Sequence, residues 1–370
     1  MSHSEFPFLE HALPGIKALQ PYVPGKPIEE LERELGIRDS IKLASNENPL
    51  GVSPKVIQVL EDGARGVARY PDGSGFRLRH RLAEMHGTGA DAITLGNGSN
   101  DVLDMLARVF LRPGDESLFS EYAFAVYPLS SQAVGANLVK APARDYGHDL
   151  EALQARITAQ TRVIWIANPN NPTGTWLPRE PLHDFLSRVP TDVIVVIDEA
   201  YFEYVEEADY PDATLWLTDF PNLVVTRTFS KAYGLAGLRV GYSLSHPVVA
   251  DLLNRVRQPF NVNLLAQSAA LAALDDPQFL ERCVAVNRAG MQQLGEGLKA
   301  LEVEFIPSVG NFLTLNLQRN AIEVDRALLQ RGVITRPIAG YGLPNHLRVS
   351  IGLETENARF LTALREVLGR

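Results

Sequence analysis

Residues 226–242 read TRTFSKAYGLAGLRVGY and place a lysine in an unusual setting. Lys231 follows Thr228 and Ser230, and Arg239 comes eight residues later. The apolar run NLVV just before this stretch predicts a buried strand that ends at a loop. Two hydroxyl groups and a guanidinium can bind a phosphate, while burial and nearby positive charge lower the pKa of the lysine amine. This layout suits a lysine held as a Schiff base beside a bound phosphate.

Other apolar runs precede this stretch. The runs VIWIA (163–167), DVIVVID (192–198) and NLVVT (222–226) are apolar along most of their length and rich in β-branched residues. Such runs fit strands that are covered on both faces, as in a mainly parallel sheet. Segments of helical length and polarity, such as 179–188, lie between the runs. This alternation predicts an α/β domain.

The pattern changes in the last third of the chain. There the helical stretch LLAQSAALAALDD is followed by more helix and by two alternating runs, NFLTLNL and HLRVSIG. The alternation predicts strands with one covered face in a smaller α+β domain. Proline and glycine cluster at 14–27 and 48–54, which indicates an extended arm and the entry into a larger domain. We therefore expect an arm at 1–48 that joins the small domain, a large domain at 49–262, and the small domain at 263–370.

The composition argues against several classes of protein. The chain has 370 residues, of which 45% are hydrophobic and 21% charged, a normal balance for a globular protein. Its net charge of −9 argues against a nucleic-acid or anionic-membrane surface. The single cysteine, Cys283, excludes an intrachain disulfide and a cysteine-cluster metal site, and the histidines show no metal-ligand spacing. Without a signal-peptide pattern or a membrane-spanning apolar run, we expect a soluble, cytoplasmic protein.

A glycine-rich motif, GNGSND at 96–101, precedes a run with apolar residues at helical spacing. Ser99 or Asn100 is expected to cap this helix. A glycine-rich turn at a helix N-terminus presents backbone N–H groups and the positive end of the helix dipole to an anion. Gly98, Ser99 and Asn100 are therefore a candidate phosphate site, and a simple capped helix start is the alternative. No Walker or G-x-G-x-x-G sequence is present here, which disfavours a nucleotide.

Two more motifs follow predicted strands. The strand VIWIA runs into the turn NPNNPTG, where the Asn171 amide can hydrogen-bond to a ring oxygen of a ligand. The next strand ends in DEAY, and its Asp198 ends a run too apolar to leave a carboxylate unpaired. A protonated pyridine nitrogen would be a suitable partner for Asp198, and Tyr201 could reach the same ring. A plain turn and a carboxylate at a solvent-exposed strand end are the alternatives.

In this order, GNGSND, NPNNPTG, DEAY and TFSK with Arg239, the motifs resemble those of fold-type I pyridoxal-phosphate enzymes of the aspartate aminotransferase superfamily. The flanking segments LQPYVPGKP, KLASNENPLG, RYPDG, TRPIAGYGLP and LRVSIG are similar to those of the histidinol-phosphate aminotransferase family. This second resemblance spans nearly the whole chain. It implies an α/β fold with a mainly parallel sheet, a smaller α+β domain, and pyridoxal 5'-phosphate as the cofactor.

The resemblance also implies roles for single residues. Lys231 matches the Schiff-base lysine, which also moves the proton between substrate and cofactor. Asp198 matches the acid that keeps the pyridine nitrogen protonated, and this makes the ring an electron sink. Asn171 and Tyr201 match the partners of the ring oxygen. The residues that match the phosphate site are Thr228, Ser230, Arg239, the turn of Gly98, Ser99 and Asn100, and Tyr70, which reaches the cofactor of the neighbouring subunit and so implies a homodimer with shared active sites.

One segment departs from the family pattern. The family commonly shows P-T-Y-x-x-Y, whose first tyrosine stacks on the pyridine ring, whereas this chain reads YAFAVY at 122–127. This alignment places Phe124 at the stacking position and Tyr127 at the second tyrosine. A phenyl ring stacks as well but brings no hydroxyl group. Tyr122 is the alternative stacking residue, and core packing is the other interpretation of Tyr122 and Tyr127.

The resemblance implies that four residues bind substrate. Arg348 matches the main anion clamp, Arg336 and Tyr22 help to hold a phosphate or a distal carboxylate, and Asn48 belongs to the same group. A planar guanidinium binds a carboxylate or a phosphate through two hydrogen bonds. The implied reaction is a ping-pong amino transfer between L-histidinol phosphate and 2-oxoglutarate, which yields imidazole acetol phosphate and glutamate in L-histidine biosynthesis.

Three alternative functions remain. An aminotransferase for aromatic amino acids shares every cofactor-binding residue. A lyase similar to threonine-phosphate decarboxylase keeps the lysine, the aspartate and the phosphate clamp. A cofactor-binding regulatory protein fits poorly, because the chain has no basic DNA-binding segment and retains the complete catalytic set.

Overall fold

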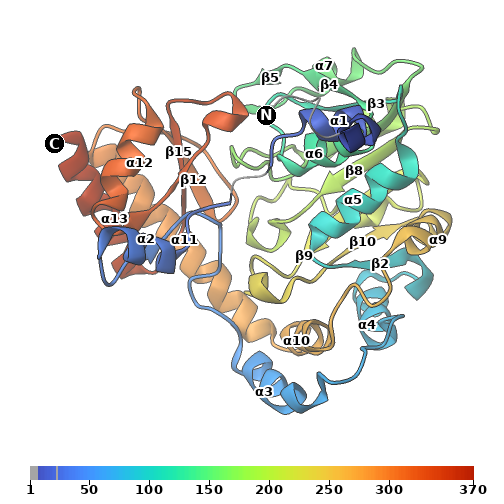
Figure 1. Ribbon diagram of the computed structural model, residues 1–370, viewed down its shortest axis with the longest axis horizontal. Coiled ribbons are helices and arrows are strands. Elements are labelled where there is room, and N and C mark those ends of the chain that lie inside the picture. Colours follow the sequence, from blue (N-terminus) through green and yellow to red (C-terminus); the bar gives the residue numbers. More distant parts are fainter. Residues whose placement is uncertain (1–6, 22–23) are drawn as a thin grey trace.

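A computed structural model describes residues 7–21 and 24–370, and a seven-stranded sheet forms its larger part (Figure 1). The strand order is β2-β10-β9-β8-β7-β3-β4. Strand β10 runs antiparallel to both of its neighbours, and the other pairings in this sheet are parallel. The mainly parallel sheet predicted from the sequence is therefore confirmed. The strands are β2 (Ile93–Gly96), β3 (Glu116–Ser120), β4 (Asn137–Ala141), β7 (Thr161–Ala167), β8 (Ile194–Asp198), β9 (Leu223–Thr228) and β10 (Gly241–Ser245).

Helices cover both faces of this sheet, and alternate residues of each strand point to opposite faces. Val163 and Trp165 of β7 pack into the cluster that includes helices α5, α6 and α9. Ile164 and Ile166 pack into the opposite cluster with helices α7 and α8. This explains why the strand sequences are apolar throughout. The helices around the sheet are α3 (Pro54–Gly63), α4 (Phe76–His86), α5 (Ser99–Phe110), α6 (Val126–Ala133), α7 (Leu150–Gln154), α8 (Arg179–Arg188), α9 (Pro247–Val256) and α10 (Leu264–Leu274).

A second, antiparallel sheet has the order β11-β12-β15-β14. Its strands are β11 (Glu304–Ile306), β12 (Phe312–Asn316), β14 (Arg336–Pro337) and β15 (His346–Ser350). Apolar side chains of β12 and β15 pack into one core with residues of α11 (Pro277–Ala300), α12 (Ala321–Leu329) and α13 (Glu354–Leu368). These elements form the smaller body at the left of Figure 1.

The prediction that β12 and β15 have only one covered face is wrong. All five residues of β15 are buried, and so are four of the five in β12. The polar side chains Thr314, Arg348 and Ser350 contact other parts of the chain instead of solvent. For example, the Thr314 hydroxyl donates to the carbonyl of Pro172, which follows β7. Their polar character therefore marks the seam between the two sheets.

The N-terminal region contacts both parts of the molecule. Helix α1 (Pro14–Ala18) contacts α6, and Gln132 Nε2 donates to the Gly15 carbonyl at 3.1 Å. Strand β1 (Ile41–Lys42) pairs in parallel with β13 (Val333–Ile334), and α2 (Ile28–Leu35) lies beside this smaller body in Figure 1. Helix α10 contacts α3 and α4. The domain boundaries proposed from the sequence stay a prediction.

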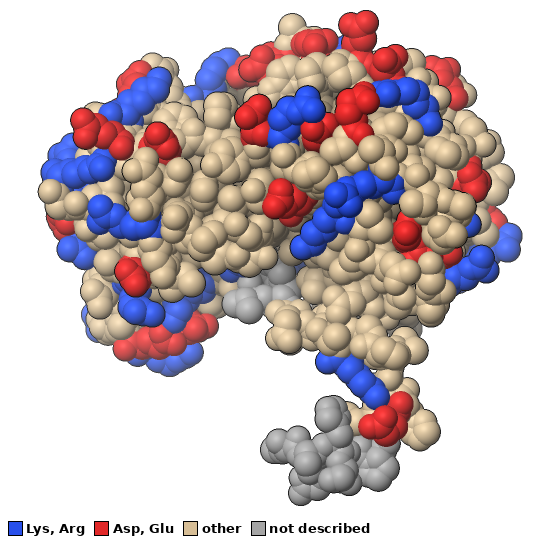
Figure 2. Space-filling view, turned by 90° about the horizontal axis from the view of Figure 1, so that it is seen from above, with Lys and Arg blue, Asp and Glu red and all other residues tan. Residues whose placement is uncertain are grey.

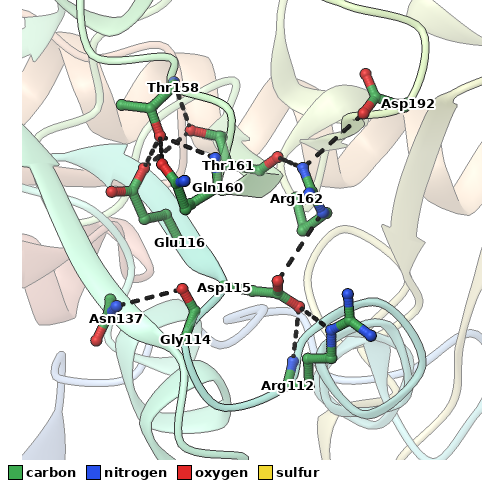
Figure 3. Close-up of polar contacts among 10 residues, drawn as sticks. All are labelled: Arg112, Gly114, Asp115, Glu116, Asn137, Thr158, Gln160, Thr161, Arg162 and Asp192. Carbon is green, nitrogen blue, oxygen red and sulfur yellow. Dashed lines mark hydrogen bonds and ion pairs between the residues drawn. The ribbon is translucent and has the colours of Figure 1, made fainter.

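Polar side chains close the amino end of the large sheet, near the starts of β3 and β7 (Figure 3). Asp115 accepts a hydrogen bond from the Arg112 backbone N–H at 3.1 Å and also faces the guanidinium groups of Arg112 and Arg162. The Thr158 hydroxyl donates to Glu116 at 2.6 Å. The charges drawn here are satisfied by their neighbours. The polar groups at the opposite, carboxyl end of the strands are arranged differently, around a cavity.

On the face seen in Figure 2, Lys and Arg side chains are interspersed with Asp and Glu side chains. Among the described residues, no helix combines the length and the apolar character needed to cross a membrane. The same residues contain no group of three or more His, Cys, Asp or Glu side chains that could hold a metal ion.

Candidate active site

A cavity of about 190 Å³ lies where β7, β8 and β9 end and where β14 and β15 face them. Parallel strands bring their carboxyl ends to one edge of a sheet, which is the usual place for a ligand in such folds. The structure brings most of the predicted site residues to this cavity. Those that line it are Ser99, Asn100, Phe124, Asn171, Asp198, Tyr201, Thr228, Ser230, Lys231, Arg239, Arg336 and Arg348.

Lys231 stands on the loop directly after β9, and its Nζ donates to the Ser45 carbonyl at 3.1 Å. Burial, together with the positive charges of Arg348 and Arg239, lowers the pKa of Lys231 to about 7, while Glu47 opposes the shift. An amine with this pKa is partly unprotonated near neutral pH. Lys231 can therefore act as a nucleophile and accept a proton.

One end of the cavity is formed by the start of α5 and by Arg239. The helix begins at Ser99, and Gly98 is its N-cap with φ +80°, so the expected cap at Ser99 or Asn100 is wrong. Glycine adopts this left-handed conformation without strain. Arg239 Nη1 donates to Ser230 Oγ at 3.2 Å, and a side chain at position 98 would run into the Arg239 guanidinium. The backbone N–H groups at the helix start thus stay open beside a cation.

Replacing Gly98 by alanine is expected to weaken phosphate-ligand binding at least about tenfold, because the new methyl group displaces Arg239 and the positive φ strains the backbone. The measurement is titration of the apoprotein with pyridoxal 5'-phosphate. Gly114→Ala is the matched control, because Gly114 has φ +97°, has open space around it and lies at the amino end of the sheet (Figure 3). Equal affinities of the two variants would contradict the assignment.

Asp198 ends β8 and is 4% exposed. Tyr127 Oη donates to its Oδ2 at 2.8 Å, and Thr226 Oγ1 donates to its Oδ1 at 2.9 Å. Burial raises the pKa of Asp198, and these two hydroxyl donors act against the rise. The carboxylate is thus held at the cavity wall in one orientation. Sequence reasoning named Asp198 but assigned no role to Tyr127 or Thr226.

Tyr201 connects several segments of the chain. Its hydroxyl oxygen accepts hydrogen bonds from Asn171 Nδ2 at 3.1 Å and from Asn46 Nδ2 at 2.9 Å. Burial raises the pKa of Tyr201 to about 12, so the phenol keeps its proton. Because both amides donate to the oxygen, the hydroxyl proton of Tyr201 is available for an acceptor in the cavity.

Arg348 projects from β15 toward the same cluster. Its Nη1 donates to Asn171 Oδ1 at 2.6 Å, and its Nη2 donates to the Ala44 carbonyl at 2.9 Å. The residue is only 7% exposed, and its buried Nε has no hydrogen-bond partner among the described residues. A buried guanidinium that lines a cavity is well suited to an anionic ligand.

The remaining predicted residues lie elsewhere. Tyr70 is 82% exposed and stacks on Phe260 with ring centroids 4.6 Å apart. Asn48 Nδ2 donates to the Ala232 carbonyl at 2.8 Å, behind the lysine loop and away from the cavity lining. Tyr22 lies outside the described residues. Of the two candidate stacking residues, Phe124 lines the cavity and Tyr122 does not. The Tyr122 ring lies beside Tyr146.

Several residues that line the cavity were not predicted from the sequence. Gly25, Ser45 and Asn46 come from the N-terminal region, and Tyr341 comes from the short helix η8 (Ala339–Tyr341). Asn46 adopts φ +53°, which asparagine tolerates better than most residues. Asn46 lies in the motif KLASNENPLG. The local sequence pattern does not indicate that Asn46 contacts Tyr201.

The family model described as aminotransferase class I and II matches residues 38–364, nearly the whole chain. The chain belongs to the class I and II aminotransferases. The prediction that it is an aminotransferase is therefore confirmed, and the lysine, aspartate and arginine described above lie within the matched region of this family.

Curated relatives in this aminotransferase family are similar over almost their full length. "Histidinol-phosphate aminotransferase 2" of Pseudomonas fluorescens (strain Pf0-1) is 57% identical over 365 residues, with 98% of this chain and 99% of that protein covered. The protein of the same name from Pseudomonas aeruginosa is 57% identical over 363 residues, with 98% of each chain covered.

Solved structures agree with this assignment. The crystal structure of histidinol-phosphate aminotransferase from Sinorhizobium meliloti in complex with pyridoxal-5'-phosphate is 30% identical to this aminotransferase. The TM-score is 0.88, and the match covers 96% of this chain and 97% of that one. The predicted fold type I is thus confirmed.

Proposed function

We propose that the chain is a histidinol-phosphate aminotransferase of L-histidine biosynthesis that uses pyridoxal 5'-phosphate. The substrate assignment is supported by the 57% identity to curated enzymes of that name over 98% of the chain. The observation that supports the chemistry is the cavity, because Lys231, Asp198 and the start of α5 line one space.

The donors and acceptors around the cavity fit this cofactor. A phosphate dianion suits the backbone N–H groups at the start of α5, the hydroxyls of Thr228 and Ser230, and the Arg239 guanidinium. A protonated pyridine nitrogen suits the buried carboxylate of Asp198. The ring oxygen suits the hydroxyl of Tyr201 with the amide of Asn171, and Phe124 supplies an apolar face for the ring.

When bound, pyridoxal 5'-phosphate supplies an electron sink for the substrate carbon and carries the amino group between two substrates. The chain supplies the proton transfer. Lys231 Nζ, with its pKa lowered to about 7, would take the proton from the amine-bearing carbon of the substrate and give it to the carbon on the other side of the amine nitrogen. The Asp198 carboxylate would stabilise the positive charge of the protonated pyridine nitrogen. The buried residues around the cavity exclude water.

The substrates of both half-reactions are anions, and Arg348 and Arg336 line the cavity on the side of the small sheet. We assign the main anion contact to Arg348, whose buried guanidinium lines the cavity. Arg336, together with Tyr22, is proposed to hold the phosphate of histidinol phosphate or the distal carboxylate of 2-oxoglutarate and glutamate.

The assembly and location are part of the same proposal. The exposed Tyr70 is proposed to reach the cofactor phosphate of a second subunit, which makes the enzyme a homodimer with shared active sites. The cytoplasm is proposed as the place of reaction.

The test is a half-reaction without an amino-group acceptor. Purified holoenzyme is mixed with L-histidinol phosphate or with phenylalanine, and conversion of bound pyridoxal phosphate to pyridoxamine phosphate is followed by absorbance. Rapid conversion with histidinol phosphate and at least about 100-fold slower conversion with phenylalanine is expected, because phenylalanine has no phosphate group and leaves the phosphate-binding donors of the substrate site unpaired. Added 2-oxoglutarate should then restore the starting spectrum.

Two outcomes would overturn the proposal in different ways. Equal rates with both amines would make the protein a broad aromatic aminotransferase. No conversion with either amine, together with carbon dioxide release from threonine phosphate, would make it a decarboxylase. The cofactor assignment would survive both outcomes.

A further inference from the structure

We propose that Tyr127 is a positioning residue, whose hydroxyl holds Asp198 ionised and correctly oriented for the pyridine nitrogen of the cofactor. This inference rests on the proposed function, since it concerns how the chain prepares Asp198 for that ring. The family motif matches Tyr127 only as a second tyrosine without a role, and Tyr127 does not line the cavity but lies one layer behind its wall.

The geometry of Asp198 is symmetric. Each carboxylate oxygen accepts one hydroxyl hydrogen bond, Oδ2 from Tyr127 at 2.8 Å and Oδ1 from Thr226 at 2.9 Å. Tyr127 comes from α6, whereas Thr226 lies opposite Asp198 on the neighbouring strand β9. Donors from two separate elements therefore fix the plane of the carboxylate. A carboxylate held in this way presents the same lone pair to the cavity at all times.

Tyr127 is itself held in place. It is 0% exposed, and its ring stacks on Trp165 with centroids 5.3 Å apart and an interplanar angle of 9°. Phe124 packs against its edge at 5.7 Å. Trp165 is anchored in turn by a hydrogen bond from Nε1 to Ser117 Oγ at 2.9 Å. Since the ring cannot turn away, its hydroxyl remains directed at Asp198.

The charge balance gives this contact a chemical role. Burial favours the neutral form of Asp198, while hydroxyl donors favour the carboxylate. The groups that face Asp198 or Tyr127 are Lys231 on the loop after β9, Tyr201 after β8, Thr226 of β9 and Tyr341 of η8. Burial and the adjacent carboxylate raise the pKa of Tyr127 far above its usual value, so Tyr127 always donates and never carries a charge.

The test is Tyr127→Phe in the holoenzyme, with Tyr242→Phe as the matched control. The phenyl ring keeps the stacking on Trp165 and removes only the hydroxyl. Tyr242 is also buried and bonds His86 at 3.0 Å, but it does not contact Asp198. The enzymes are loaded with pyridoxal phosphate labelled with ¹⁵N at the ring nitrogen, and the ¹⁵N chemical shift is followed against pH.

In Tyr127→Phe the ring nitrogen is expected to lose its proton at lower pH than in the parent, because Asp198 becomes a weaker stabiliser of positive charge. We expect kcat to fall about tenfold or more, as for loss of a hydrogen bond to a charged group, while KM stays within about twofold. Tyr242→Phe should leave the ¹⁵N titration unchanged. An unchanged titration and kcat in Tyr127→Phe would overturn the inference.

Two controls keep the result interpretable. If Tyr127→Phe does not fold, 3-fluorotyrosine is placed at position 127, where it keeps the ring and makes the hydroxyl a stronger donor. The pH midpoint of the ring-nitrogen titration should then rise. An unchanged midpoint would refute the proposed role of Tyr127. If the parent protein itself shows no protonated ring nitrogen, the proposed function fails instead. The two failures are therefore distinguishable.

Discussion

Replacing Lys231 by alanine is expected to reduce turnover of histidinol phosphate by at least about 10⁴-fold, because the variant loses both the nucleophile and the group that moves the proton. Among the described residues, Lys231 is the only lysine that lines the cavity. The measurement is kcat in the steady state, together with the absorbance of the bound cofactor. That absorbance should change to the form seen with free pyridoxal phosphate.

Lys140→Ala is the control, because Lys140 is exposed on β4, the edge strand of the large sheet. It should keep parental activity. If Lys231→Ala retained more than about a tenth of the parental kcat, Lys231 would not be the catalytic base, and the function proposed here would be lost with it.

The second large effect is expected for Asp198→Asn, which should lower kcat about 10³-fold, as for removal of one preorganised electrostatic group. The amide has the same size as the carboxylate but carries no charge to stabilise a protonated pyridine. Thermal stability should stay constant or rise, because a buried carboxylate is expensive to desolvate. Loss of activity without loss of stability separates this chemical role from a structural one.

The control for Asp198 is Asp192→Asn. Asp192 lies 3.9 Å from Arg162 at the amino end of the sheet (Figure 3), and it is solvent-exposed. Both variants remove one carboxylate, so only the position differs. A similar kcat for the two variants would contradict the assignment of Asp198.

The sequence predicted the part of the site that is local. Lys231, Asp198 and Asn171 each follow an apolar run, and the carboxyl ends of parallel strands meet at one edge of a sheet. Their convergence therefore follows from the strand pattern alone. The sequence also singled out Ser99, Asn100 and Arg239, which line the same cavity, because a glycine-rich helix start and an arginine close to the lysine are both local features. Their role in binding a phosphate stays a prediction.

The remaining contacts could not be predicted because they join distant positions. Tyr127 meets Asp198 across 71 positions, and Asn46 meets Tyr201 across 155. No periodicity links such pairs. The error over β12 and β15 has a related cause: alternating polar residues predict a solvent face, but here they face another part of the same molecule. The cap of α5 was misassigned because Gly98 meets a backbone requirement, φ +80°, that composition does not reveal.

The bonds at Ala44, Asn46, Arg348 and Ser350 have a consequence for how the protein is made. Arg348 Nη2 donates to the Ala44 carbonyl, and the Asn46 N–H donates to Ser350 Oγ at 2.8 Å, each across 304 positions. During synthesis the N-terminal partners leave the ribosome long before their counterparts exist. The large sheet can assemble in the meantime, but the side of the cavity lined by Arg336 and Arg348 is complete only after β15 has been made. An interrupted translation product therefore lacks a complete site and cannot transfer amino groups.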